Sequence, residues 1–265
     1  MADEPKFLTR NYLDEFATLT LVNGGPVTAV LPRLFDRDRE LLFRTSGADS
    51  DLTTVELTIE FKGAGAAVAR TIDTIALLGH NLASVDFERW DGAAFVLIPG
   101  GAFTGLTTDT LVFSFSSLSP QRIKVKMRTT RTANQEKEAG ELLVMGTLMA
   151  FAANDGFSDL RPDHQPVAVV TAMADDGVAV NQLRWAGNRV DRYRARMSFR
   201  LMTKAVLDSL QAVVKLNEVT AYPEPTQRPE AFYLGTFLTG GFPHSYTSEG
   251  YKGAGYSLDL EFRES

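Results

Sequence analysis

Residues 71–92 most constrain the fold of this chain, because an apolar run, a sharp turn and an alternating run follow one another there. The first run, residues 75–78, is apolar throughout and stops at Gly79-His80-Asn81. The second run places Val85 and Phe87 on one face before an Asp-Gly turn signal. A buried strand followed by a half-exposed strand predicts one corner of a β-sandwich. Nothing in the segment is typical of a catalytic nucleophile, so it favours a recognition or assembly protein over an enzyme core.

Three further segments in the first half alternate in the same way. Leu52–Phe61, Thr110–Ser116 and Arg122–Arg128 carry apolar residues at every second position. Strands at this spacing, with no long helical pattern between them, are typical of a sandwich. Residues 129–140 are polar and poor in apolar side chains. We therefore predict a β-sandwich domain over residues 1–140.

The second half combines strands with one helix. Gly140–Phe151 is expected to open the new domain as a strand, and Arg192–Leu201 and Tyr256–Phe262 alternate cleanly. Thr203 is a candidate N-cap, and the residues after it carry one apolar stripe. The stripe consists of Leu207, Leu210, Val213 and Val214. These patterns predict a mostly β domain over residues 141–265, a small barrel or sheet packed on one helix at about 203–216.

Composition narrows the function classes. A hydrophobic fraction of 44% and a charged fraction of 23% over 265 residues are ordinary for a globular protein. The net charge of −6 gives no support for nucleic-acid binding. Since cysteine is absent, disulfides, thiolate metal sites and cysteine nucleophiles are excluded. The chain shows no signal-peptide layout and no apolar run long enough to span a membrane, so we expect a soluble product of a reducing cytoplasm.

His80, Asn81 and Trp90 are the candidates for contact with a glycan. His80 and Asn81 would form a polar pair at the rim of the sandwich, and Trp90 would stack on a sugar ring. The alternative for the pair is a turn whose side chains satisfy local backbone groups. The alternative for Trp90 is partly buried packing ahead of a turn. We weigh both alternatives above the glycan interpretation.

Other patterns give no support for catalysis or metal binding. Lys62–Ala67 lacks the glycine spacing and the Lys-Ser/Thr ending of a phosphate loop. Asp155, Asp159 and Asp163 match no calcium-loop signature, and His164 and His244 show no metal-ligand spacing. There is no Gly-x-Ser-x-Gly motif. We predict no catalytic residue, no cofactor, no metal and no enzymatic activity. A glycoside hydrolase stays the enzymatic alternative, because 33 acidic residues always allow some carboxylate pair.

Two strand faces are unusually basic. One carries Arg122, Lys124, Lys126 and Arg128, and the other carries Arg192, Arg194, Arg196 and Arg200. Such a face is either a solvated edge or is complemented by acidic strand faces such as that of Asp259 and Glu261. The complement lies within one subunit or between the subunits of a ring. Because arginine favours bidentate pairing, we predict that the second strand makes inter-subunit contacts.

Two groups of segments resemble known phage proteins. The first resembles the discoidin-type, galactose-binding-like sandwich of some phage and prophage tail proteins, and comprises Asn11-Tyr12-Leu13, Pro32–Asp36 and Ile72–Leu82. The second resembles the hub domain of distal tail or minor tail proteins of long-tailed phages, and comprises Tyr193–Arg200 with its helix, Tyr222–Pro225 and Gly253–Tyr256. Here the sandwich precedes the hub, whereas many distal tail proteins begin with the hub.

The resemblance implies a discoidin-like β-sandwich followed by a hub-type split β-barrel packed on one helix. It also implies a structural subunit of the virion, made in the bacterial host cytoplasm and placed at the tail tip or baseplate hub. Such subunits form a homo-oligomeric ring, expected to be hexameric, that joins the tail tube to the receptor-binding apparatus. Its partners would be copies of itself, tail-tube and tail-tip proteins and, through the sandwich, a host surface glycan. The alternative function is a carbohydrate-binding accessory module of a tail.

Overall fold

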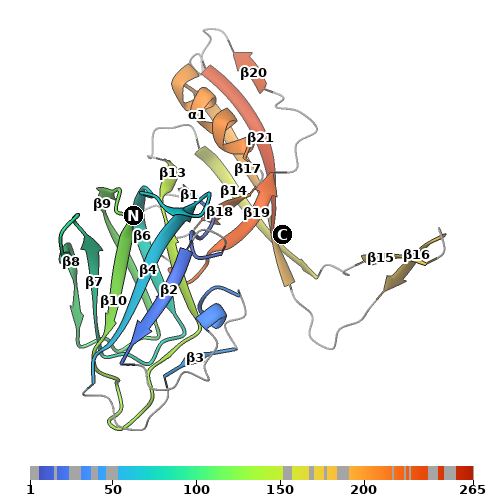
Figure 1. The fold of residues 1–265 in the computed structure, drawn as a ribbon. Coiled ribbons are helices and arrows are strands. Elements are labelled where there is room, and N and C mark those ends of the chain that lie inside the picture. Colours follow the sequence, from blue (N-terminus) through green and yellow to red (C-terminus); the bar gives the residue numbers. More distant parts are fainter. Residues whose placement is uncertain are drawn as a thin grey trace. The chain divides into compact units, whose positions relative to one another are not determined.

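The computed structural model divides the chain into two units (Figure 1). It describes residues 6–14, 17–23, 31–36, 41–45, 53–151, 157–166, 170–175, 178–183, 191–216, 218–223, 225–226, 228–237, 244–247 and 255–264. Leu8–Leu148 with Glu224–Ala231 form one unit, here called the sandwich unit. Met1–Phe7, Met149–Pro223 and Phe232–Ser265 form the other, here called the sheet–helix unit. Both are mostly β, as the sequence predicts.

Two antiparallel sheets make up the core of the sandwich unit. The larger sheet has the order β2 (Ala17–Val22), β4 (Val55–Gly63), β10 (Arg122–Met127), β7 (Ser84–Trp90) and β8 (Phe95–Thr104), and β5 (Ala66–Ala67) pairs with β4. The smaller sheet has the order β12 (Glu141–Met145), β6 (Ile72–Leu78) and β9 (Thr110–Leu118). A short pair, β3 (Phe43–Arg44) and β11 (Glu138–Ala139), and the 3-10 helix Leu31–Leu34 complete it. Among the described strands, β8 and β9 therefore lie at the sheet edges.

The alternation in the sequence decides which side chains face the core. Val55, Leu57, Ile59 and Phe61 of β4 are all buried, while the residues between them are half-buried. In contrast, β6 is buried along nearly its whole length, as its continuous apolar run predicts. Fully burying one such aliphatic or aromatic side chain contributes roughly 1.5–3 kcal/mol relative to leaving it exposed. The two predicted strands of residues 71–92 are confirmed as β6 and β7.

Strand β12 belongs to the sandwich by its pairing. It runs antiparallel to β6, from Glu141 opposite Leu78 to Met145 opposite Thr74. On its other side the buried amide of Asn11 donates to the Leu142 carbonyl (2.9 Å) and accepts from the Val144 N–H (3.0 Å). Gly140–Phe151 was expected to open the second domain, but its first strand completes the smaller sheet instead. The domain boundary at 140 itself stays a prediction.

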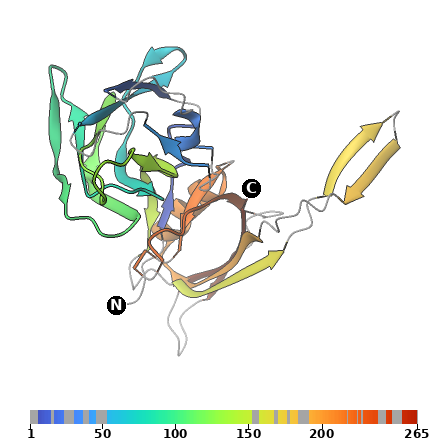
Figure 2. The ribbon, with the colours of Figure 1, turned by 90° about the horizontal axis from the view of Figure 1, so that it is seen from below.

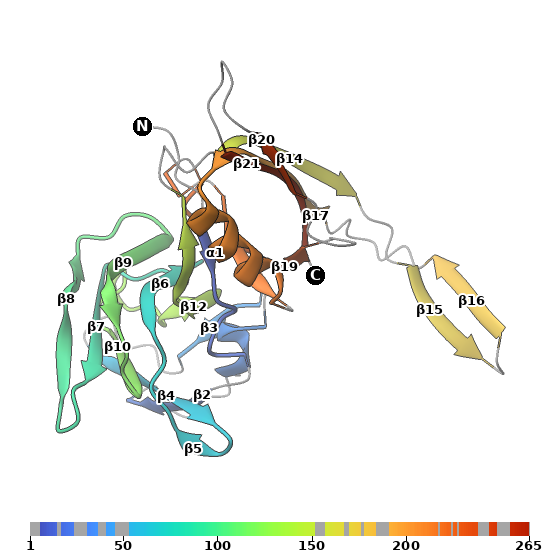
Figure 3. The same ribbon diagram turned by 90° about the horizontal axis from the view of Figure 1, so that it is seen from above.

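The sheet–helix unit is one large sheet with a helix on one face (Figure 3). The strand order is β13 (Thr147–Ala150), β1 (Lys6–Leu8), β18 (Val219–Tyr222), β19 (Tyr233–Phe237), β21 (Gly255–Glu264), β17 (Asp191–Met202) and β14 (Phe157–Pro166), with β20 (His244–Thr247) paired to β21. Figure 2 shows that this sheet is strongly curved. No pairing joins β13 to β14 among the described strands, so the described sheet is open. The hub-type split barrel stays a prediction.

Helix α1, Lys204–Val214, confirms the predicted helix at about 203–216. Thr203 caps it, because its hydroxyl accepts the Val206 N–H at 3.3 Å. Leu207, Leu210 and Val213 are buried in one apolar cluster with Leu260 and Phe262 of β21. The predicted stripe thus packs on the sheet.

A separate hairpin consists of β15 (Val170–Asp175) and β16 (Val178–Leu183). These strands pair with each other, and with no other strand in the described part of the chain. Figures 1 to 3 show them as a two-stranded ribbon.

Candidate recognition surface

The turn at His80 and Asn81 is an internal structural element. His80 is 1% exposed, and its Nδ1 accepts the Leu82 N–H at 3.1 Å. The Asn81 amide donates to the Glu136 carbonyl (2.7 Å) and accepts from the Glu138 N–H (3.0 Å). The Asn81 side chain therefore ties the segment before β7 to residues 136–138, while the His80 side chain bonds within the turn. This is the arrangement that the turn interpretation expects.

Burial also sets the protonation state of His80. Desolvation, followed by the nearby charge of Arg131, lowers the pKa of His80 to about 4, while Asp109 opposes the shift. Arg131 donates to the His80 carbonyl at 2.6 Å. The imidazole is thus neutral at pH 7. His80 offers no exposed surface to a sugar, and the hydrogen bonds of Asn81 are already used within the loop.

Trp90 lies in a different environment, on the outer face of the larger sheet. Val85 and Phe87 of β7 face the core, so Asp86, Glu88 and Trp90 face outward. The register places Phe95 of β8 directly opposite Trp90, and the two half-buried rings lie 5.2 Å apart, edge to face. The sequence alone did not single out Phe95. Its signal was the Asp91-Gly92 turn, which predicts a hairpin and hence the Trp90–Phe95 pair.

Two cations lie over these rings. The Arg122 guanidinium is 5.5 Å from the centroid of Trp90, and the Lys124 ammonium is 4.4 Å from that of Phe95. Arg122 Nε also donates to Glu60 at 2.5 Å. Two aromatic rings, two cations and a carboxylate thus meet on one partly exposed face. We call Trp90, Phe95, Arg122, Lys124 and Glu60 the aromatic–cation surface.

The basic face of β10 is complemented within the same chain. Because β10 lies between β4 and β7, each cation meets a carboxylate on a neighbouring strand. The pairs are Arg122–Glu60 (2.5 Å), Lys124–Glu56 (2.7 Å), Lys126–Glu88 (2.6 Å) and Arg128–Asp86 (2.7 Å). The intramolecular interpretation of this face is therefore correct. Its suggested partners, Asp259 and Glu261, are wrong for this strand.

These ion pairs perturb the carboxyl groups. The pKa of Glu60 is held below its ordinary value by hydrogen bonds from Lys62 and then Arg122. The pKa of Glu56 is lowered chiefly by the hydrogen bond from Lys124, against a smaller opposing effect of burial. Both groups are therefore ionised at neutral pH, and the surface presents carboxylate acceptors beside its donors.

The second basic strand, β17, has different residues opposite it on its neighbouring strands. It lies between β14 and β21, and its arginines include Arg192, Arg194, Arg196 and Arg200. Arg194 is opposite Asp163 and Arg263, and Arg196 is opposite Arg161 and Glu261. Each of these two arginines therefore meets one acidic and one basic position. The predicted inter-subunit contact stays a prediction.

Within the described residues there is neither a metal-ligand cluster nor a helix suited to span a membrane. No group of three or more His, Asp or Glu residues in this part of the chain is placed to hold a metal ion. Asp159, Asp163 and His164 lie on β14, His244 lies on β20, and Asp155 lies outside the described residues. Among the described helices, none has the length and apolar character needed to cross a membrane.

No protein-family model matches this sequence, and neither does any curated protein. Solved structures do match, over about half of this chain. Chitosan-binding module 1 from the chitosanase/glucanase of Paenibacillus sp. IK-5 is 13% identical, with 51% of this chain and 98% of that chain covered and a TM-score of 0.39. A carbohydrate-binding module (CBM32-5) of Clostridium perfringens, in complex with GalNAc-β-1,3-galactose, is 14% identical, with 48% and 94% covered and a TM-score of 0.38. A Ruminococcus gnavus fucosidase in complex with fucose is 18% identical, with 52% of this chain but 26% of that chain covered and a TM-score of 0.40.

Proposed function

We propose that the sandwich unit binds carbohydrate through the aromatic–cation surface, as a non-enzymatic recognition module. The observation that carries this proposal is the outward-facing pair of rings, Trp90 and Phe95, beside the charged side chains of Arg122 and Lys124. Both rings are partly exposed and lie outside the apolar core cluster. Each ring can therefore offer apolar surface to a ligand.

The chemistry of the surface suits a sugar. The apolar C–H face of a pyranose ring packs on an aromatic ring, while its hydroxyl groups need both donors and acceptors. Arg122 and Lys124 supply donors, and the ionised Glu60 supplies an acceptor. Each contact is shallow, so a single site is expected to be weak, on the order of millimolar. Several copies in one assembly would raise the avidity.

A glycan array followed by titration of the best sugar tests this proposal. Trp90→Ala should abolish saturable binding, and Phe95→Ala should weaken it by about tenfold. Leu97→Ala is the matched control, because Leu97 is an apolar residue of the same strand and is 46% exposed. Unchanged affinity in Trp90→Ala, or an array without any saturable sugar, would refute the carbohydrate site.

A second candidate function is assembly, as a structural subunit of a phage tail tip that joins copies of the chain into a ring. The β15–β16 hairpin favours it. A hairpin of two strands is marginally stable on its own in water and usually needs a further packing partner. Met173 is opposite Val180 and Val170 is opposite Leu183, so apolar residues recur along the ribbon. A neighbouring copy, or a tail-tube or tail-tip protein, would supply such a packing surface.

Light scattering and negative-stain microscopy of the purified chain test this second candidate. Replacing residues 170–183 by a short Gly-Ser linker, or reversing Arg194→Glu and Arg196→Glu together, should convert a ring into monomers. Lys204→Glu with Lys215→Glu is the control, since it makes the same charge change on α1 and its C-cap. A monomeric native chain, or a variant whose mass equals that of the native assembly, would count against ring formation.

A further inference from the structure

The open side of the sandwich holds a pocket that two β-bulges create. Strands β8 and β9, the edge strands of the two sheets, line it. In β8, the register shifts between Asp86–Ala102 and Glu88–Leu97, so residues 98–101 lie opposite Phe87 alone. In β9, the register shifts between Thr74–Ser114 and Ile72–Leu118, so residues 115–117 lie opposite Asp73 alone. Bulges of this kind re-aim side chains and are common beside binding sites.

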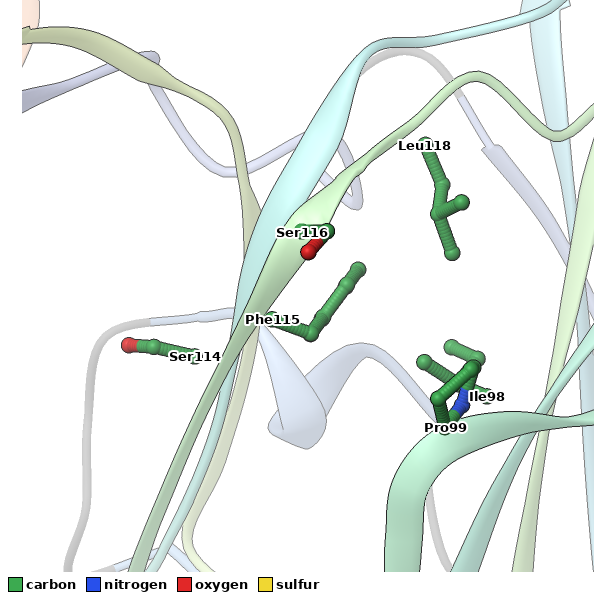
Figure 4. A pocket seen from close by; sticks show the side chains of 6 residues that line it. All are labelled: Ile98, Pro99, Ser114, Phe115, Ser116 and Leu118. Atoms are coloured by element: carbon green, nitrogen blue, oxygen red, sulfur yellow. The ribbon is translucent and has the colours of Figure 1, made fainter.

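Both bulges contribute to the walls of the pocket. Its volume is about 520 Å³, and it is lined by Ile98 and Pro99 of β8 and by Ser114, Phe115, Ser116 and Leu118 of β9. Figure 4 shows the side chains of Phe115 and Leu118 on the side of β9 that faces Ile98 and Pro99. The extra residues of both strands therefore form much of the lining, together with the flanking Ser114 and Leu118.

The backbone of the β8 bulge depends on two glycines. Gly100 has a φ of +78°, in the left-handed region that glycine favours. A Cβ atom at position 101 would lie 2.9 Å from the carbonyl oxygens of both Ile98 and Phe87. Neither backbone oxygen can move aside without breaking the local strand. The sequence Ile98-Pro99-Gly100-Gly101 thus specifies the kink that holds this side of the pocket open.

The same features select the kind of occupant. Pro99 lacks an N–H to donate, and a bulge interrupts the regular spacing of edge hydrogen bonds, so β8 is poorly suited to pair with an incoming strand. A volume of 520 Å³ lies within the range of about 300–1,000 Å³ that is typical of small-molecule sites. The lining is four apolar side chains and two serines, and none of the six residues is charged.

We propose that this pocket is a binding site for a small neutral molecule with an apolar body, separate from the aromatic–cation surface. Phe115 and Leu118 pack against the body of the ligand, and the hydroxyl of Ser116 is the polar group available at the wall. Trp90 faces outward on the larger sheet, so a ligand in the pocket does not depend on it.

N-phenyl-1-naphthylamine, a neutral dye whose fluorescence rises in apolar surroundings, tests the site on the full chain. The native chain should bind the dye saturably, and Phe115→Ala should weaken binding by about tenfold. Ser117→Ala is the matched control, because Ser117 is an exposed residue of the same β9 bulge and is not among the residues that line the pocket. It should bind as the native chain does, and so should Trp90→Ala, whose failure to bind sugar would be a separate result.

Leu118→Ala is a second pocket variant, in case Phe115→Ala does not fold. Thermal unfolding without dye shows whether each variant is folded. A weakened affinity in either folded variant, with Ser117→Ala unchanged, supports the pocket. The proposal is overturned if the native chain shows no saturable dye binding, or if folded Leu118→Ala and Phe115→Ala bind as tightly as Ser117→Ala.

Discussion

Two candidate sites for sugar contact flank strand β7 in the sequence, and the structure places them in opposite environments. His80-Asn81 before the strand and Trp90 at its end are both polar or aromatic residues beside a turn, and both are candidates for sugar contact. In the structure, the first end faces into loop backbone and the second faces outward. The difference shows that a turn covered by a distant segment becomes structural, whereas a turn on a free sheet face stays available for recognition.

The largest expected effect is a loss of stability when Asn81, in the covered turn before β7, is replaced. Asn81→Ala should lower the free energy of unfolding by about 2–4 kcal/mol, because it leaves the Glu138 N–H and the Glu136 carbonyl without their partner. Asn81→Asp is the matched variant: it keeps the acceptor for the Glu138 N–H but sets a carboxylate oxygen against the Glu136 carbonyl, so its loss should be no smaller. Urea unfolding measures both. Equal stability of Asn81→Ala and the native chain would remove the structural role of this turn.

Titration of His80 should give the next largest effect. Its pKa is about 4 in the folded chain against 6.5 as the ordinary value, so the unfolded chain binds the proton more readily. The stability from neutral burial is complete above pH 6.5 and is lost as the pH falls toward 4, by on the order of 2–3 kcal/mol. In His80→Asn, whose side-chain oxygen can accept the Leu82 N–H, the unfolding free energy should change less over that range. A native curve that is flat between pH 6.5 and 4 would contradict the buried neutral state.

Replacing Trp90, at the exposed end of β7, should affect ligand binding and not stability. Trp90→Ala should cost less than about 1 kcal/mol in unfolding free energy, since the ring is half-buried and lies outside the core. Sugar binding should nevertheless be lost. Thermal unfolding and titration of the same sample separate these two outcomes. A large loss of stability would show that Trp90 is a packing residue and would remove the contrast with Asn81.

The smallest effect is expected from the carboxylates of the ion-paired face. Glu56 and Glu60 have lowered pKa values in the folded chain, so their contribution is present above the ordinary value of 4.5 and is lost as the pH falls below it. Each of these partly exposed surface pairs is worth at most about 1 kcal/mol. Glu56→Gln with Glu60→Gln should therefore reduce the acid sensitivity of unfolding below pH 4.5 and leave the His80 range unchanged. If the double variant instead unfolded with less pH dependence between pH 6.5 and 4.5, the assignment of that range to His80 would be wrong.

The two basic strands extend the same lesson. Arg122–Arg128 and Arg192–Leu201 have nearly the same alternating pattern, yet the first meets carboxylates on both sides. The second has like charges opposite it at two positions, Arg194–Arg263 and Arg161–Arg196. The pattern predicted which residues share a face in both cases. It could not predict their neighbours, because those come from strands far away in the sequence.

The sequence by itself determined the local structure: the strands of residues 71–92, the alternation of β4 and β10, and helix α1 with its Thr203 cap. These depend on side-chain periodicity and capping, which involve residues close together in the chain. Only the tertiary structure decided that β12 joins β6, that His80 is buried, and that Phe95 lies against Trp90. It alone brought the bulges of β8 and β9 together around a pocket. Strand order and register arise from pairing between distant segments, and a local pattern does not specify which distant segment will be the partner.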